Sequence, residues 1–320
     1  MSEDTFPAPR ILVLRGGAIG DFVCTLPALT ALRERWPAAY IELIGYPHVA
    51  GLAAEAGLVD RVRSLDQADV AQWFSFAPRI REEQAARLRT FDLVLSYLYD
   101  PYGTVRENML AAGALQVLYG DPRVRAGHAV DHLLKPLQEL AIFPEGDAQP
   151  RLDLGPDAAA DGRRRLPVRG DDAVLLHPGS GSTAKNWPLA RFLALAGRIA
   201  AAGLGTPVFL VGEADEAIAA ELARRPAPAP VMAGLSLAEA ARVLSACRAY
   251  VGNDSGMTHL AAALGLPTVA LFGPSNPAAW GPRGRRVRIV RSTEPTTESL
   301  AQTEPETILH VLRALIGGED

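Results

Sequence analysis

The sequence predicts an α/β protein of two doubly wound, Rossmann-like domains that face each other across a cleft. A chain of 320 residues is too long for one ordinary core and suits two domains of about 150 residues each. Short apolar segments of β type alternate with helical segments throughout, and the alternation runs through twice. That pattern is typical of parallel sheets with helices on both faces.

The first half opens with a short buried strand and a long helix. The helix reaches about Trp36 with leucines on one face, and Pro27 predicts a kink or an irregular first turn within it. Expected strands lie at residues 11–14, 40–44, 61–65 and 91–96, with a further candidate at 114–118. Expected helical stretches lie near residues 79–89, 104–112 and 129–141.

Residues 154–172 are polar and rich in helix-breaking residues, so we expect the domain boundary there, after residue 158. The second half then repeats the alternation. Expected strands are 173–176, 207–211, 249–252 and 268–272, and expected helices end near residues 202, 225, 246 and 264. Capping boxes at Ser236 with Glu239 and at Thr303 with Glu306 predict two helix starts, the second for an amphipathic closing helix.

Composition restricts the function classes. The content of 48% hydrophobic and 21% charged residues is typical of a soluble globular enzyme, and a net charge of −4 gives no electrostatic case for a nucleic-acid partner. The two cysteines, Cys24 and Cys247, are far apart, which suits a reducing compartment. The polar N-terminus is unlike a signal peptide, and no apolar run approaches the roughly 18 residues that span a bilayer. We therefore expect a cytoplasmic protein.

The strand at residues 249–252 runs into Asn253-Asp254-Ser255-Gly256 and then a helix. A helix that starts just after a strand aims its free N–H groups and positive dipole end at the sheet edge, which makes an anion site. His259 in the first helical turn can add a donor. The alternative is an ordinary β-α-β unit whose loop residues only cap the helix.

A second loop of this kind spans residues 177–187. Its small and hydroxylated residues, with Ser182 and Thr183 among them, could cradle phosphate, and Lys185 offers a mobile cation. It is not a P-loop, because no Gly-Lys-Ser/Thr stands at the helix start. The alternative is a flexible surface loop with a solvated lysine. Two cradles in one half of the chain suggest a diphosphate or a nucleotide.

A third glycine-rich loop, residues 16–21, follows the first strand and ends at Asp21. The G-x-G-x-x-G spacing of a dinucleotide site is absent, and no carboxylate follows the second strand to hold a ribose. Asp21 could therefore act as a general base on an incoming hydroxyl. The alternative is that it only stabilises the helix dipole.

No pattern in the sequence predicts a metal site, and we expect no cofactor. His128 and His132 lie four residues apart on an expected helix, but no glutamate completes a His-Glu-x-x-His zinc motif. Four arginines between residues 79 and 89 predict a basic helical face, which is more often a solvated surface than a binding site.

Three segments carry a family resemblance. ILVLRGGAIGDFVCTLPALTALRERWP, LLHPGSGSTAKNWP and VGNDSGMTHLAAALGLPTVALFGPSNP, in that order and spacing, resemble glycosyltransferase family nine, the family of the ADP-heptose:lipopolysaccharide heptosyltransferases. The resemblance implies a GT-B fold. It implies an acceptor-binding N-terminal domain, residues 1–158, and a nucleotide-sugar-binding C-terminal domain, residues 159–320. It also implies that the closing helix, residues 304–316, returns towards the N-terminal domain.

The resemblance also implies roles for single residues. Asp21 matches the family's general base, and Lys185 matches the lysine that contacts the donor diphosphate; both are expected catalytic residues. Glu213 or Asp215 is expected to hold the ribose, and Met232 to lie beside the adenine. The full set of expected donor-binding residues is Gly17, Gly20, Ser182, Thr183, Lys185, Glu213, Asp215, Met232, Asp254, Ser255, Gly256 and His259.

The reaction that the resemblance implies is inverting transfer of heptose from ADP-heptose to a hydroxyl of a lipopolysaccharide core or related acceptor, without a metal. A lipid acceptor would call for contact with the inner membrane surface, for which the arginines of residues 79–89 are a candidate patch. The alternatives are another donor, a protein or small-molecule acceptor, a GT-B sugar-nucleotide epimerase, and a protein that binds a nucleotide-sugar without transferring it.

Overall fold

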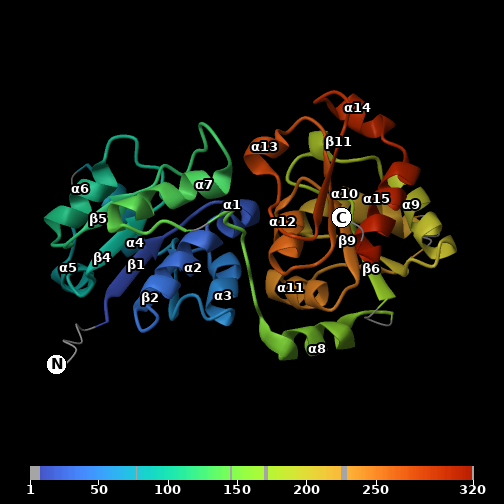
Figure 1. Cartoon of the computed structure of the whole chain (residues 1–320). Coiled ribbons are helices and arrows are strands. Elements are labelled where there is room, and N and C mark those ends of the chain that lie inside the picture. The colour runs from blue at the N-terminus through green and yellow to red at the C-terminus, as the bar shows by residue number, and fades with distance from the viewer. Residues whose placement is uncertain (1–7, 77, 145, 169–171, 225–228, 319–320) are drawn as a thin grey trace. The chain divides into compact units, whose positions relative to one another are not determined.

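The computed structural model describes residues 8–76, 78–144, 146–168, 172–224 and 229–318. The chain forms two compact units. One comprises the residues up to Gly17 together with Cys24–Ala148, and the other comprises Ala18–Val23 together with the residues from Gln149 onward. Each unit holds one parallel sheet with its own helices (Figure 1).

The first unit is built on a five-stranded parallel sheet in the order β3-β2-β1-β4-β5. Its strands are β1 (Arg10–Leu14), β2 (Tyr40–Gly45), β3 (Arg61–Ser64), β4 (Leu93–Ser96) and β5 (Val117–Tyr119). Its helices are α2 (Leu26–Arg35), α3 (Pro47–Glu55), α4 (Ala68–Ala71), η1 (Gln72–Phe74), α5 (Glu82–Leu88), α6 (Thr104–Ala111), α7 (Ala129–Leu134) and η2 (Lys135–Leu140). Because the strand order reverses at β1, right-handed crossovers put helices on both faces.

The second unit is built on a six-stranded parallel sheet in the order β11-β10-β9-β6-β7-β8. Its strands are β6 (Ala173–His177), β7 (Thr206–Leu210), β8 (Val231–Met232), β9 (Ala249–Asn253), β10 (Thr268–Phe272) and β11 (Val287–Arg291). Its longer helices are α8 (Gly155–Arg165), α9 (Leu189–Ala201), α10 (Glu216–Arg224), α11 (Leu237–Ser245), α12 (Gly256–Ala263) and α15 (Pro305–Gly317). Its shorter ones are α1 (Ile19–Val23), η4 (Thr183–Lys185), η5 (Glu213–Asp215), α13 (Pro277–Trp280) and α14 (Thr297–Gln302).

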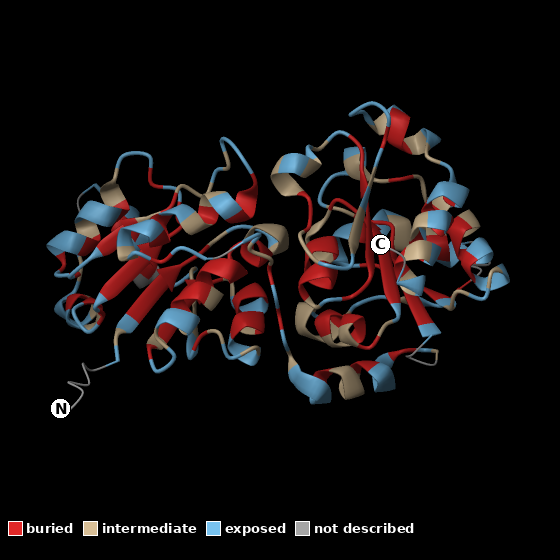
Figure 2. Cartoon of the chain, viewed as in Figure 1, coloured by how far each residue is buried: buried red, intermediate tan, exposed pale blue. Residues whose placement is uncertain are grey.

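The central strands of each sheet are buried over most of their length, as Figure 2 shows. β6, β9 and β10 are buried at every position, which is why they read as continuous apolar runs in the sequence. In the second unit the core extends from these strands to α9 and α15, where Trp187 meets Phe192 edge-to-face at 4.9 Å between ring centroids. These strands therefore present fixed carboxyl ends to the loops that follow them.

Two expectations about the first half are confirmed. The helix after β1 is interrupted at Cys24 and Thr25, and Pro27 lies in the first turn of α2, where its missing N–H costs nothing. The strands expected in the first half are present, and the candidate at residues 114–118 is the short β5.

The division of the chain differs from the expected one. Residues 154–172 include α8, which packs closely against α11, so the contacts divide the chain between Ala148 and Gln149 and not after residue 158. The polar residues of α8 form its exposed face, and its buried face is small: Ala158 and Gly162. Leu152 also donates its N–H to the carbonyl of Ala263, which ties the chain to the second unit before α8 begins.

The closing helix packs on its own unit. The buried side of α15 carries Ile308, Leu309, Leu312 and Leu315 and contacts α9, β10 and β11. The capping box at Ser236 and Glu239 is confirmed. The one at Thr303 is wrong, because Pro305 starts the helix and leaves Glu304 at the N-cap.

The basic helical face expected between residues 79 and 89 is also wrong. α5 begins at Glu82, so Arg79 and Arg81 precede it. Arg87 forms an ion pair with the fully buried Glu42 of β2, and Arg89 forms one with Glu82. Among the described residues, no helix is both long and apolar enough to cross a bilayer.

Candidate functional site

The candidate site lies where the strand order of the second sheet changes direction. The chain goes from β6 outward to β7 and β8, and returns on the other side of β6 as β9. In doubly wound sheets, ligands bind at the carboxyl ends of the two strands that flank this point. Here those ends are His177 of β6 and Asn253 of β9, and they open into the two loops that the sequence predicts to be phosphate cradles.

Lys185 and Asp254 join the two loops. The Lys185 Nζ donates to Asp254 Oδ2 at 2.7 Å, although the residues are 69 positions apart in the sequence. The Asp254 side chain is buried, whereas the Lys185 side chain is 37% exposed and stays open on one side. The ammonium is therefore held in place by a carboxylate while it remains available to a second anion.

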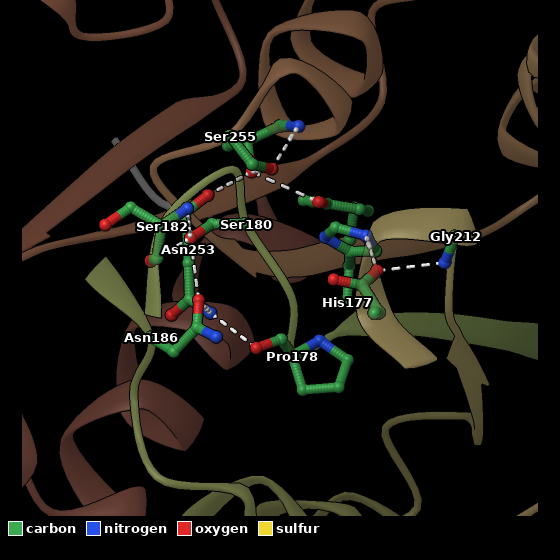
Figure 3. Close-up of polar contacts among 11 residues, drawn as sticks. His177, Pro178, Ser180, Ser182, Asn186, Gly212, Asn253 and Ser255 are labelled. Atoms are coloured by element: carbon green, nitrogen blue, oxygen red, sulfur yellow. Dashed lines mark hydrogen bonds and ion pairs between the residues drawn. The ribbon is translucent and has the colours of Figure 1, made fainter. Parts of the chain in front are cut away.

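Asn253, fully buried at the end of β9, fixes both ends of the first cradle. Its Nδ2 donates to the carbonyl of Pro178 at 2.8 Å, and its Oδ1 accepts the N–H of Trp187 at 3.0 Å. Figure 3 shows this side chain beside Pro178 and Asn186 of that loop. From the sequence alone, Asn253 is only a turn residue after a strand. The sequence does not show that its side-chain amide bonds the backbone of Pro178 and Trp187.

Within the loop of residues 177–187, the Ser180 hydroxyl bonds the backbone of Ser182. Its Oγ donates to the carbonyl of Ser182 at 2.7 Å and also accepts the N–H of Ser182 at 3.2 Å (Figure 3). Ser182 and Thr183 are exposed at the start of η4, which carries Lys185. These two predicted donor residues and the lysine therefore occupy one ordered turn.

The second cradle is the start of α12. Ser255 is its N-cap, and its Oγ accepts the N–H of Thr258 at 3.4 Å. The Thr258 hydroxyl donates to the carbonyl of Asn253 at 2.5 Å, which ties the helix to the strand before it. His259 lies in the first turn and is buried. The remaining N–H groups at this end of α12, with its positive dipole end, are the anion-binding feature that the sequence predicts.

The segment with Asp21 belongs to the second unit by its contacts. α1 packs against α12, and the approach is so close that a Cβ added to Gly256 would lie 2.6 Å from the Cβ of Ile19. Only glycine fits at that position. A Cβ on Gly20 would lie 3.5 Å from the His259 ring. Asp21 lies half-buried on α1, and its Oδ2 accepts the N–H of Ala18 at 3.0 Å.

The two candidate ribose carboxylates differ sharply in exposure. Glu213 is exposed at the start of η5, whereas the Asp215 side chain is only 5% exposed. Asp215 Oδ2 accepts the N–H of Gly212 at 2.9 Å and lies 3.3 Å from His177 Nε2. Burial acts to raise the pKa of Asp215, but the hydrogen bonds from His177 and from the Gly212 amide outweigh it, so the pKa is below its usual value.

The other predicted residues lie at the margins of this arrangement. Met232 is half-buried on β8, and β7 lies between β8 and β6. Gly17 is exposed in the turn before α1 and is the residue at which the first unit passes into the second. The structure thus brings Lys185 and Asp254 into contact, and Gly20, Gly256 and His259 into another cluster.

Within the part of the chain that the structure describes, no three His, Cys, Asp or Glu side chains come together as a metal site would need. His128 and His132 have structural roles instead. The Nδ1 of His128 accepts the N–H of Val130 at the start of α7, and the Nε2 of His132 lies 2.7 Å from the carbonyl of Asp121.

Comparison with known proteins gives consistent matches. Residues 109–310 match the model of glycosyltransferase family 9 (heptosyltransferase). The chain is 28% identical to lipopolysaccharide heptosyltransferase 1 of Pseudomonas aeruginosa, over 92% of this chain and 87% of that protein. Its fold matches the structure of Escherichia coli ADP-heptose lps heptosyltransferase II with a TM-score of 0.78 at 23% identity, covering 97% of this chain and 99% of the other. It also matches an E. coli heptosyltransferase determined with ADP, with a TM-score of 0.72 at 21% identity, over 96% and 99% of the two chains. The fold is therefore GT-B, as expected.

Proposed function

This chain belongs to glycosyltransferase family 9 and is a glycosyltransferase, and we propose that it transfers a heptose from ADP-heptose to a hydroxyl of a lipopolysaccharide-core or related acceptor. The reaction inverts the anomeric centre. The acceptor hydroxyl attacks from the side of Asp21, and ADP leaves from the opposite face.

The observation that carries this proposal is the Lys185–Asp254 pair across the two loops at the switch point of the second sheet. A diphosphate that enters between the loops meets the ammonium of Lys185, the hydroxyls of Ser182 and Thr183, and the N-terminal amides of α12. These groups stabilise the negative charge that develops on the leaving diphosphate.

Asp21 is proposed as the general base. Its helix packs on α12, so the carboxylate belongs to the same unit as the diphosphate loops. This role does not require a strong base, because the acceptor hydroxyl becomes acidic as its bond to carbon forms. Until then the carboxylate is oriented by the N–H of Ala18.

For the nucleoside, the exposed Glu213 is the better candidate to hold the ribose hydroxyls, and Met232 is the candidate beside the adenine. Asp215 is buried and engaged by two donors, which makes it a poor direct ligand. The adenine and heptose assignments follow the matched proteins, one of which is named an ADP-heptose heptosyltransferase and another of which was determined with ADP. We propose that the first unit supplies the acceptor-binding surface, with membrane contact if the acceptor is a lipid.

The test is direct binding. Isothermal titration calorimetry with ADP, UDP and GDP, without added metal, is expected to show a preference for ADP. Preference for UDP or GDP would contradict the heptose donor, and no binding by any of the three would contradict the nucleotide-sugar site itself. Incubation with ADP-heptose alone, followed by NMR, separates transfer from epimerisation, because an epimerase converts its donor without an acceptor.

A further inference from the structure

His177 and Asp215 form a buried polar pair beneath the proposed donor loops, and the proposed reaction does not use either of them directly. Both side chains are 5% exposed. His177 ends β6 and precedes the diphosphate loop, whereas Asp215 closes η5, the turn after β7 that carries Glu213. The pair thus spans the two segments proposed to bind different parts of one ligand.

Three contacts converge on the Asp215 carboxylate. His177 Nε2 lies 3.3 Å from Oδ2, and the Gly212 N–H donates to the same oxygen at 2.9 Å (Figure 3). On the other side, Gly179 lies so close that an added Cβ would be 1.8 Å from Oδ1. Asp215 therefore contacts three segments: the end of β6, the loop of residues 177–187 (the diphosphate loop), and the turn of residues 212–215 that carries Glu213 (the ribose turn).

The hydrogen bonding of His177 selects one form of its ring. Nδ1 is buried and has no hydrogen-bond partner among the described residues. A buried N–H without an acceptor is more costly than a buried lone pair without a donor. Nε2 therefore carries a proton, which it donates to Asp215.

We propose that Asp215 and His177 are positioning residues that hold the ribose turn and the diphosphate loop in one fixed register, so that Glu213 and Lys185 engage the nucleoside diphosphate together. This inference rests on the proposed nucleotide-sugar function. Without the pair, the two loops would move independently. Binding of the nucleotide would then have to order them, and this entropic cost would weaken the affinity. The pair acts on donor binding and not on the chemical step.

Two substitutions of His177 separate this role from simple filling of space. In His177→Gln the side-chain amide can reach the position of Nε2 and donate to Asp215, whereas in His177→Asn the amide ends near the position of Nδ1. We expect His177→Gln to keep the ADP affinity of the wild type within about threefold and His177→Asn to weaken it about tenfold or more, as loss of a hydrogen bond to a charged group predicts. At saturating donor, kcat should change less than the donor KM. The control is His310→Asn on the exposed face of α15, which should leave ADP affinity unchanged.

Amide hydrogen exchange of the ligand-free protein provides a second measurement, which does not require activity. Asp215→Asn removes the charged acceptor of the Gly212 N–H, so exchange should accelerate at Gly212 and in residues 178–186 while α9 and α15 stay protected. Asp161→Asn, which breaks an exposed ion pair with Arg165, is the matched control.

The outcomes separate the two claims. If wild-type protein binds ADP and His177→Gln and His177→Asn lose affinity equally, or neither loses any, the positioning role is overturned and the proposed function stands. Unchanged exchange at Gly212 in Asp215→Asn overturns it as well. If wild-type protein does not bind ADP, the proposed function fails and this inference fails with it.

Discussion

Lys185 is one of only two lysines in the chain, which allows a clean test of its charge. Lys185→Ala removes the cation that Asp254 holds at the proposed diphosphate site. We expect ADP to bind about 10- to 100-fold more weakly, the usual range for a charge-assisted hydrogen bond. Lys135→Ala, at an exposed position in the first unit, is the matched control. Calorimetry that gave the same ADP affinity for both variants would remove Lys185 from the donor site.

Asp215 makes a prediction about acid stability. Its pKa in the folded protein is below the usual value of 3.8, so its contribution to stability is complete above pH 3.8 and is lost as the pH falls through the folded-state pKa. Asp215→Asn should therefore be less stable than the wild type at neutral pH, and the difference should shrink below pH 3.8. Urea unfolding between pH 2.5 and 7 measures it. A difference that stayed constant over this range would contradict the assignment of the charge to Asp215.

For single residues, the sequence predicts which side chains have the chemistry to bind a diphosphate or a ribose. It does not predict which of these side chains are exposed. Lys185 and Asp254 were predicted from two separate loops, and the structure brings them into contact. Glu213 and Asp215 cannot be told apart from the sequence. Their difference arises from the position of His177 and Gly179, which come from another strand and its loop.

Among the elements, α8 depends most clearly on a single residue. A Cβ added to Gly162 would lie 1.9 Å from the carbonyl oxygen of Arg242 on α11, so even alanine cannot be accommodated without separating the two helices. We expect Gly162→Ala to destabilise the second unit by about 2 kcal/mol or more in urea unfolding.

Gly197 provides the opposite case as a control. It lies exposed within α9 with open space around its Cα, so Gly197→Ala should stabilise the protein by about 1 kcal/mol through higher helix propensity. If both glycine substitutions had the same sign, close α8–α11 packing would not explain the first result.

The central strands and most long helices are predictable from the sequence because their burial pattern is continuous. Apart from α3, which buries Val49, Ala50, Leu52 and Ala53, the elements that were missed bury little side-chain surface. β8 has two residues, and β11 at the sheet edge contains two arginines and no fully buried residue. α8 was hidden by Gly155 and Pro156 at its start and by an arginine-rich end, and its partner α11 is far away in the sequence.

For the whole molecule, the proposed mechanism requires no metal ion, and this can be tested. Because Lys185, the loop amides and the N-terminus of α12 are proposed to stabilise the leaving diphosphate, transfer should keep its rate after dialysis against EDTA. Loss of activity that Mg²⁺ or Mn²⁺ restores would contradict this.

The most direct measurement is a transfer assay with ADP-heptose and a heptose-free lipopolysaccharide core acceptor, comparing the wild type with Asp21→Asn. Mass spectrometry of the acceptor and the release of ADP report the same event. We expect the wild type to add one heptose unit. We expect Asp21→Asn to bind ADP normally and to lose about 100-fold or more in kcat, the usual contribution of a general base. An acceptor that gains no heptose from the wild type, or an Asp21→Asn variant that transfers at the wild-type rate, would contradict the proposed reaction.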